Sequence, residues 1–167
     1  PIFDGEPDAT DYATIAGAID RDFLSDAGGE GGAAPSEGDT LTIGDAEYTW
    51  AATTSEDDSD NVNLSLVFGD PPFVVAYAYA EFTAPAARSV TLGVGTDDDG
   101  KMWVNGEDVY THRWGRGVGL DDDAVAVELV EGVNRILIKV MNREQSWGFV
   151  CRIMDAQGLG DKLINAA

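Results

Sequence analysis

The stretch "YTHRWGRG" gathers side chains that could bind a ligand. Four of them stand within five positions: His112, Arg113, Trp114 and Arg116. An aromatic ring stacks on the apolar face of a pyranose, while guanidinium and imidazole groups donate hydrogen bonds to hydroxyls or a carboxylate. We therefore expect a sugar-binding loop, and its two arginines favour an acidic sugar such as a uronate. The alternative is that both arginines pair with Asp121–Asp123 and only fix the loop.

A run of three acids, Asp97, Asp98 and Asp99, lies between two apolar alternations. Calcium takes several carboxylate and carbonyl oxygens, so these residues are candidate ligands. The alternative is a turn whose carboxylates accept backbone N–H bonds. The spacing does not match an EF-hand loop, and similar acidic runs occur at residues 57–60 and 121–123. The sequence leaves both interpretations open.

The usual signatures of catalysis are missing. The chain has one His and one Cys, no G-x-S-x-G element, no G-x-x-x-x-G-K-[S/T] phosphate loop and no zinc-ligand spacing. Any pair of carboxylates could be selected from the 31 acidic residues, so such pairs carry no information. We expect a protein that is not an enzyme.

Charge excludes some partners. The 31 acidic residues outnumber the 10 lysines and arginines, which gives a formal net charge of −21. Such a chain repels phosphates, so neither nucleic acid nor an anionic membrane surface is an expected partner. An acidic coat also keeps a protein soluble in salty surroundings without marking any site.

Cysteine usage and the ends of the sequence add little. Cys151 is single, so it forms no intrachain disulfide, and its place in "WGFVCRIM" predicts a core position. No stretch approaches the length of a membrane span, and we expect no membrane insertion. The first residues, "PIFDGEP", resemble no signal region.

The elements that must position these residues are short strands. Residues 1–38 are rich in Gly, Ala and acids and predict an irregular wrap, and residues 157–167 predict a tail or the start of a linker. Between them, residues 39–156 predict the sandwich proper. Apolar residues fall at every second place in eight segments, as half-buried antiparallel strands require: 39–50 (a hairpin), 62–69, 73–84, 89–96, 101–110, 124–132, 134–142 and 147–155. This pattern favours an all-β antiparallel sandwich of the jelly-roll type.

The segment "KMWVNGEDVY" fixes a register. Asn105-Gly106 is the strongest short hairpin signal, since both residues accept the positive φ of a type I′ turn. Met102 and Val104 are expected to face the core, which places Trp103 on the outer face or under a neighbouring segment.

The succession "AYAYAEFTAP", "VTLGVGTDDDGKMWVNGEDV", "HRWGRG", "LDDDAVAVELVEGVNRILIKV" and "WGFVCRI" resembles galactose-binding-domain-like β-sandwiches, which accompany bacterial polysaccharide-degrading and surface enzymes. It is also similar to the sugar-binding domains of family 2 glycosidases and, more faintly, to PA14 modules. The resemblance covers residues 38–154. It is more specific for fold than for ligand, because such sandwiches host sugar binders and structural domains alike.

The resemblance implies a non-catalytic carbohydrate-binding module of a secreted or surface bacterial protein, tethered to an enzyme or surface protein. Its ligand would be a polysaccharide or oligosaccharide, and structural calcium would be common in this class. Strand pairing of that type would bring Arg143 and Trp147 to the ligand loop, although Trp147 could equally be a core residue. The rival interpretation is a structural or adhesion domain with no sugar ligand.

Overall fold

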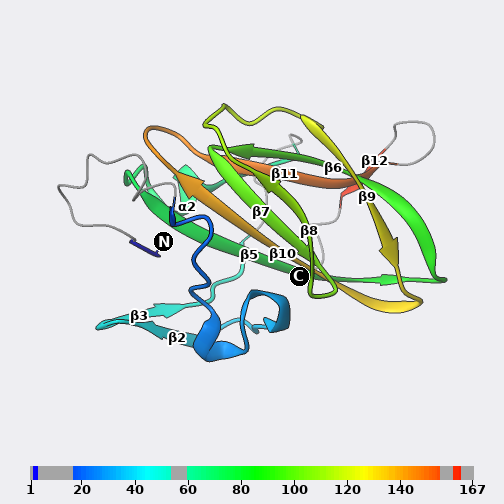
Figure 1. Ribbon diagram of the computed structural model, residues 1–167, viewed down its shortest axis with the longest axis horizontal. Coiled ribbons are helices and arrows are strands. Elements are labelled where there is room, and N and C mark those ends of the chain that lie inside the picture. Colours follow the sequence, from blue (N-terminus) through cyan, green and yellow to red (C-terminus); the bar gives the residue numbers. More distant parts are fainter. Residues whose placement is uncertain (1, 4–16, 54–59, 155–159, 163–167) are drawn as a thin grey trace.

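A computed structural model describes residues 2–3, 17–53, 60–154 and 160–162 as two packed antiparallel sheets (Figure 1). The β10 sheet has the order β1 (Ile2–Phe3), β5 (Val74–Ala84), β10 (Gly132–Asn142), β7 (Asp99–Val104) and β8 (Glu107–His112). The β6 sheet has the order β12 (Gly160–Lys162), β11 (Gly148–Met154), β6 (Arg88–Asp97) and β9 (Asp123–Leu129), and β4 (Asn61–Asn63) also pairs with β11. The predicted all-β sandwich is confirmed. No helix in the described part of the chain is long and apolar enough to cross a membrane.

From β5 to β11 the chain changes sheet at every connection except the β7–β8 hairpin. That hairpin turns at Asn105 and Gly106, whose φ angles of 52° and 88° match the predicted type I′ turn. The β8–β9 connection is one of the crossings between sheets, and it carries the "HRWGRG" stretch.

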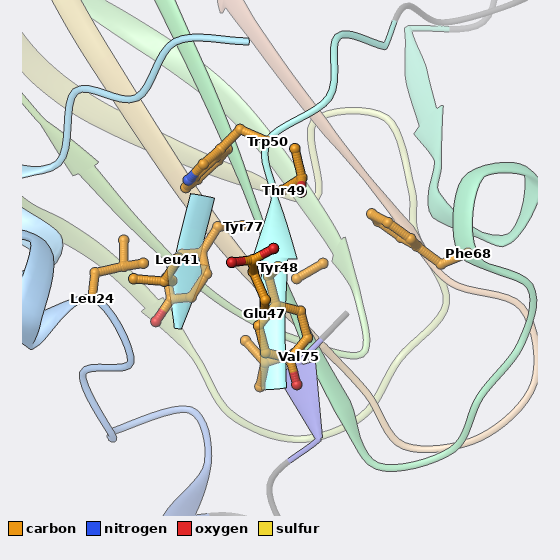
Figure 2. Close-up of a pocket in the computed structure, with 10 residues that line it drawn as sticks. Leu24, Leu41, Glu47, Tyr48, Thr49, Trp50, Phe68, Val75 and Tyr77 are labelled. Carbon is orange, nitrogen blue, oxygen red and sulfur yellow. The ribbon is translucent and has the colours of Figure 1, made fainter. Parts of the chain in front are cut away.

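The outer face of the β10 sheet is covered by residues 17–53. This cover contains two 3-10 turns, η1 (Ser25–Ala27) and η2 (Glu30–Gly32), and the separate hairpin of β2 (Thr40–Ile43) and β3 (Ala46–Thr49). Apolar side chains of the cover pack on the sheet, and a cavity of about 300 Å³ remains beside the hairpin (Figure 2).

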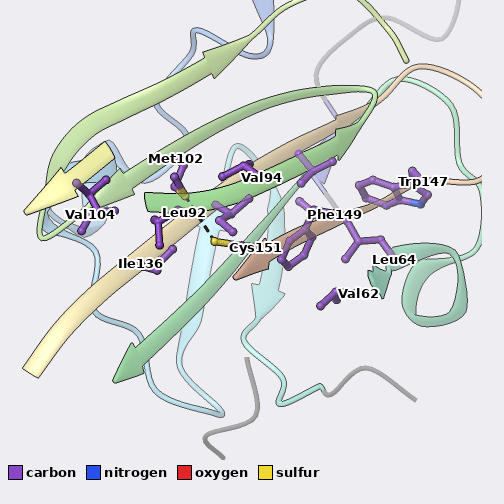
Figure 3. Packing of buried hydrophobic residues seen from close by; sticks show 14 of the residues in the cluster. Val62, Leu64, Leu92, Val94, Met102, Val104, Ile136, Trp147, Phe149 and Cys151 are labelled. Atoms are coloured by element: carbon purple, nitrogen blue, oxygen red, sulfur yellow. Dashed lines mark hydrogen bonds between the residues drawn. The ribbon is translucent and has the colours of Figure 1, made fainter. Parts of the chain in front are cut away.

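The main core lies between the two sheets (Figure 3). Met102 and Val104 point into it as predicted, while Trp103 packs with Leu24 and Leu137 on the outer face. Cys151 is a buried core residue, and its sulfur lies 3.8 Å from that of Met102. Burial raises the pKa of the Cys151 thiol to about 12, so it is a packing residue and not a nucleophile.

The strand expected over residues 62–69 is wrong from Leu64 onward. β4 ends at Asn63, and Leu64–Phe68 form the short helix α2. The side chain of Asn63 accepts a hydrogen bond from the backbone N–H of Leu66, which caps the helix and diverts the chain from the strand. Leu66 is consequently 66% exposed and does not continue the buried row of Val62 and Leu64.

Candidate functional site

The candidate site is the 112–117 loop, which comprises His112 at the end of β8 and the first five residues of the connection to β9. Its most exposed large side chain is Trp114, at 72% of its full accessible surface. A tryptophan exposed to this extent gains nothing from the core and leaves its ring available to a partner.

The backbone of Trp114 is held from two sides. Its N–H donates to a carboxylate oxygen of Asp99 at 2.9 Å, and Nε2 of His112 lies 2.8 Å from its carbonyl oxygen. The φ angle of Trp114 is 129°, in a region that residues other than glycine rarely adopt. The loop thus presents the ring on a braced and strained backbone, a combination that often marks functional positions.

Arg143, from the β10–β11 connection, lies beside this loop. Its guanidinium donates to both carboxylate oxygens of Asp99 at 2.9 Å, and its backbone N–H donates to Asp98 at 2.7 Å. A Cβ on Gly115 would lie 2.7 Å from a carboxylate oxygen of Asp98 and 3.3 Å from Cδ of Arg143. A side chain at position 115 would therefore have to displace the Asp98 carboxylate and press on Arg143.

The other two arginines are both paired, with different partners. Arg116 donates to Asp123 at 2.5 Å and to the hydroxyl of Tyr110 at 3.0 Å, and lies 3.6 Å from Asp122. Burial alone would raise the pKa of Asp123, but the bonds from Arg116 and Tyr110 lower it overall. Arg116 therefore pairs with the 121–123 acids, as the alternative interpretation of the loop predicts.

Arg113 does not reach the 121–123 acids. Its guanidinium forms two hydrogen bonds with the carboxylate of Asp20, in the cover of the outer sheet face, and the bond from Arg113 lowers the pKa of Asp20. This contact ties the 112–117 loop to the N-terminal part of the chain. Nothing in the local sequence signals it, since the two residues are 93 positions apart.

Trp147 lies in the core, where it is 2% exposed. Its indole N–H donates to the carbonyl of Gly69 at 2.9 Å, and its backbone N–H donates to the hydroxyl of Ser65. The core interpretation of Trp147 fits these contacts, and its ring has no access to the 112–117 loop surface.

The three acids at 97–99 occupy different environments. Asp99 is buried against Arg143, while Asp98 accepts the backbone N–H of the same residue. Burial raises the pKa of Asp97 to about 6, and the charge of Asp98 adds to that shift. Within the described residues, no three acidic, His or Cys side chains are grouped to hold a metal ion. The contacts fit the turn interpretation for Asp98 and Asp99, and the calcium hypothesis stays a prediction.

Compared with known proteins, the chain matches no family model and no curated sequence. The resemblance to galactose-binding-domain-like modules therefore rests on the order of motifs and on the sandwich architecture. Architecture alone does not assign a ligand, so function is argued from the 112–117 loop.

Sequence reasoning missed the cavity beside the β2–β3 hairpin. Its aromatic lining comes from three separate segments: Tyr48 and Trp50, Phe68, and Tyr77. The alternation of Tyr48 and Trp50 in "EYTW" was the available signal, because two aromatic residues two positions apart point to one side of a strand. What the sequence could not reveal is which other segments meet them.

Proposed function

We propose that this domain is a non-catalytic carbohydrate-binding module that binds a polysaccharide or oligosaccharide through the 112–117 loop. The supporting observation is the 72% exposure of Trp114 on a backbone held by Asp99 and His112. An exposed indole on a held backbone has only two side-chain torsions to order, so it stacks on a sugar ring with little loss of side-chain freedom.

The charges of the loop favour a neutral sugar. Arg113, Arg116 and Arg143 each pair with a carboxylate, so their positive charges are compensated within the protein. A uronate would have to displace one of these acids and approach a chain with a net charge of −21. We therefore revise the acidic-sugar hypothesis in favour of neutral polysaccharides, with N–H groups of Arg113 left to donate to hydroxyls.

The proposal extends to the larger protein that would carry this module. A single exposed platform buries little area and binds weakly, so such a module gains avidity when it is tethered. We propose that the sandwich is a galactose-binding-like jelly roll and that the parent is a secreted or cell-surface enzyme or surface protein. The acidic surface suits an extracellular, saline medium.

The deciding experiment is a glycan-array and affinity-gel screen of the domain and of Trp114→Ala. Leu120→Ala is the matched control, because Leu120 is 58% exposed in the same β8–β9 connection but carries no ring. We expect retention on at least one neutral glycan, loss of that retention in Trp114→Ala, and no change in the control. Absence of binding to every glycan would contradict the proposal.

A structural or adhesion domain is the second candidate, and one observation favours it. The pairs of Arg116 with Asp122 and Asp123 fix the loop as a purely structural role would require. That candidate leaves the exposure of Trp114 without a reason. Quenching of Trp fluorescence that is unaffected by any glycan would favour it.

A further inference from the structure

In the described part of the chain, the β5 edge of the β10 sheet is unpaired over most of its length. On one side, β10 pairs with all of Val74–Ala84. On the other, β1 pairs only with Val74 and Val75, and no described strand pairs with residues 76–84. An unpaired strand edge presents free backbone N–H and C=O groups to any extended chain that approaches it. The β5 edge and the 112–117 loop lie near opposite edges of the sheet, because β5 and β8 stand near opposite ends of its strand order.

The cavity of about 300 Å³ lies where this open edge begins. Residues 47–49 of β3, the following Trp50 and residues 75–77 of β5 line it, together with Leu24 and Leu41 of the cover (Figure 2). Val75 and Tyr77 pack against the cover on the outer sheet face. The cavity is therefore a slot between the β2–β3 hairpin and the outer face of the sheet, beside the point where the pairing of β5 with β1 ends.

The walls of the slot suit an apolar side chain. Tyr48, Trp50, Tyr77 and Val75 contribute ring and aliphatic surface, and Phe68 of α2 lies at one end. The α2 helix continues the apolar surface outward, because Leu66 and Val67 beside Phe68 are also exposed. Exposed apolar surface that is contiguous with a cavity marks an interaction site.

The charge of Glu47 and of the whole chain indicates which kind of partner the slot would bind. Glu47 lines the slot, and no ion pair to it is found in the described part of the chain. The chain carries a net charge of −21, so a second copy would be repelled, whereas a basic segment would be attracted.

We propose that the β5 edge binds an extended, positively charged peptide segment of a partner protein by strand addition. The peptide continues the line of β1 along residues 76–84, one of its apolar side chains fills the slot, and a Lys or Arg lies against Glu47. Backbone pairing supplies affinity, and the slot supplies specificity.

The test is selection of a phage-displayed library of random nonapeptides on the intact domain. We expect enriched sequences that alternate apolar residues and contain Lys or Arg. A synthetic peptide of the enriched sequence should shift backbone NMR signals of β5 and β3. Glu47→Lys should weaken its binding about tenfold, while Glu107→Lys, an exposed charge reversal on the distant β7–β8 hairpin, should not.

Strand addition itself is tested on the peptide, which leaves the protein unchanged. N-methylation of alternate peptide bonds removes the donors of one peptide edge at a time. We expect at least one of the two methylated versions to lose binding. The proposal is overturned if no peptide is enriched, if binding survives both methylations, or if the NMR shifts map away from β5.

Discussion

Arg143 and Asp99 form an ion pair, through Nη2 of the arginine, that connects three segments of the molecule. Both carboxylate oxygens of Asp99 accept from the guanidinium at 2.9 Å, and one of them also accepts the backbone N–H of Trp114. Asp99 is 1% exposed. A single buried carboxylate at the start of β7 therefore fixes both the β10–β11 connection and the 112–117 loop.

Removal of the arginine alone should be costly. Arg143→Met leaves the buried charge of Asp99 without its cation, and we expect a loss of about 3 kcal/mol in the free energy of unfolding. Urea denaturation measures it. The double variant Asp99→Asn/Arg143→Met should lose less than Arg143→Met, because it leaves no buried charge. A double variant that is less stable than the single one would contradict this account of the pair.

The strain at Trp114 predicts an unusual difference between two variants. Glycine adopts a φ of 129° without penalty and alanine does not, so Trp114→Gly should be about 1 kcal/mol more stable than Trp114→Ala. Thermal unfolding of the two variants side by side checks this. Both should lose glycan retention equally, since both lack the ring. Equal stability would mean that the backbone of residue 114 is unstrained.

The strands of the sandwich were predictable because local patterns determined them. Alternation placed Met102 and Val104 inward, and Asn105-Gly106 predicted its turn from two residues alone. The helix α2 was missed because the apolar alternation of Val62 and Leu64 continues to Leu66, although the helix already begins at Leu64, where Asn63 caps it by accepting the backbone N–H of Leu66.

The candidate site was predictable in part. The residues of the 112–117 loop were identified from composition, and Arg143 does lie beside that loop. The partner of Arg113 was not predictable, because Asp20 is brought to it only by the cover of the outer sheet face. For Trp147 the sequence left both a ligand-binding and a core position open. Its burial could not be predicted, because burial depends on how the sheets assemble and not on residue type.

The raised pKa of Asp97 predicts that the folded protein becomes less stable as the pH rises. Burial, with help from Asp98, raises its folded pKa to about 6 from an ordinary 3.8, so between these values the folded state binds more protons than the unfolded state. Stability from this group is present at about pH 4 and is lost by about pH 7. Solvent screening at this half-buried site limits the effect to about 1 kcal/mol. Asp97→Asn should therefore stabilise the protein at pH 7.5 but not at pH 4.5, by urea midpoints; an equal effect at both would contradict the assignment.

Calcium is tested at the same residue. A cation bound at Asp97–Asp99 would relieve the repulsion between Asp97 and Asp98, so the calcium hypothesis predicts a higher melting temperature with calcium than with a chelator. Asp97→Asn should abolish that difference. Identical melting curves with calcium and with chelator would contradict the calcium hypothesis. The turn interpretation would then account for these acids, with Asp99 paired to the guanidinium of Arg143 and Asp98 accepting the backbone N–H of the same residue.

Lys139 of β10 attaches the cover, residues 17–53, to the outer face of the β10 sheet. Its ammonium is fully buried on the outer sheet face and donates to the carbonyls of Ile19 and Arg21 at 3.0 and 2.6 Å and to the carboxylate of Glu30 at 2.9 Å. Lys139→Met would leave the Glu30 carboxylate with the Tyr77 hydroxyl as donor but without its cation, and would remove the ammonium donor from two carbonyls, so we expect a loss of about 3 to 5 kcal/mol.

The matched control for that variant is Lys101→Met. Lys101 lies on the same sheet face, but its partner Asp108 is half exposed, so the change should cost less than about 1 kcal/mol. Hydrogen exchange and limited proteolysis of residues 17–32 separate the two. We expect Lys139→Met to lose protection there before the sandwich unfolds, because three of its bonds to that segment are gone. Uniform loss of protection over the whole chain would mean that cover and sandwich unfold as one unit.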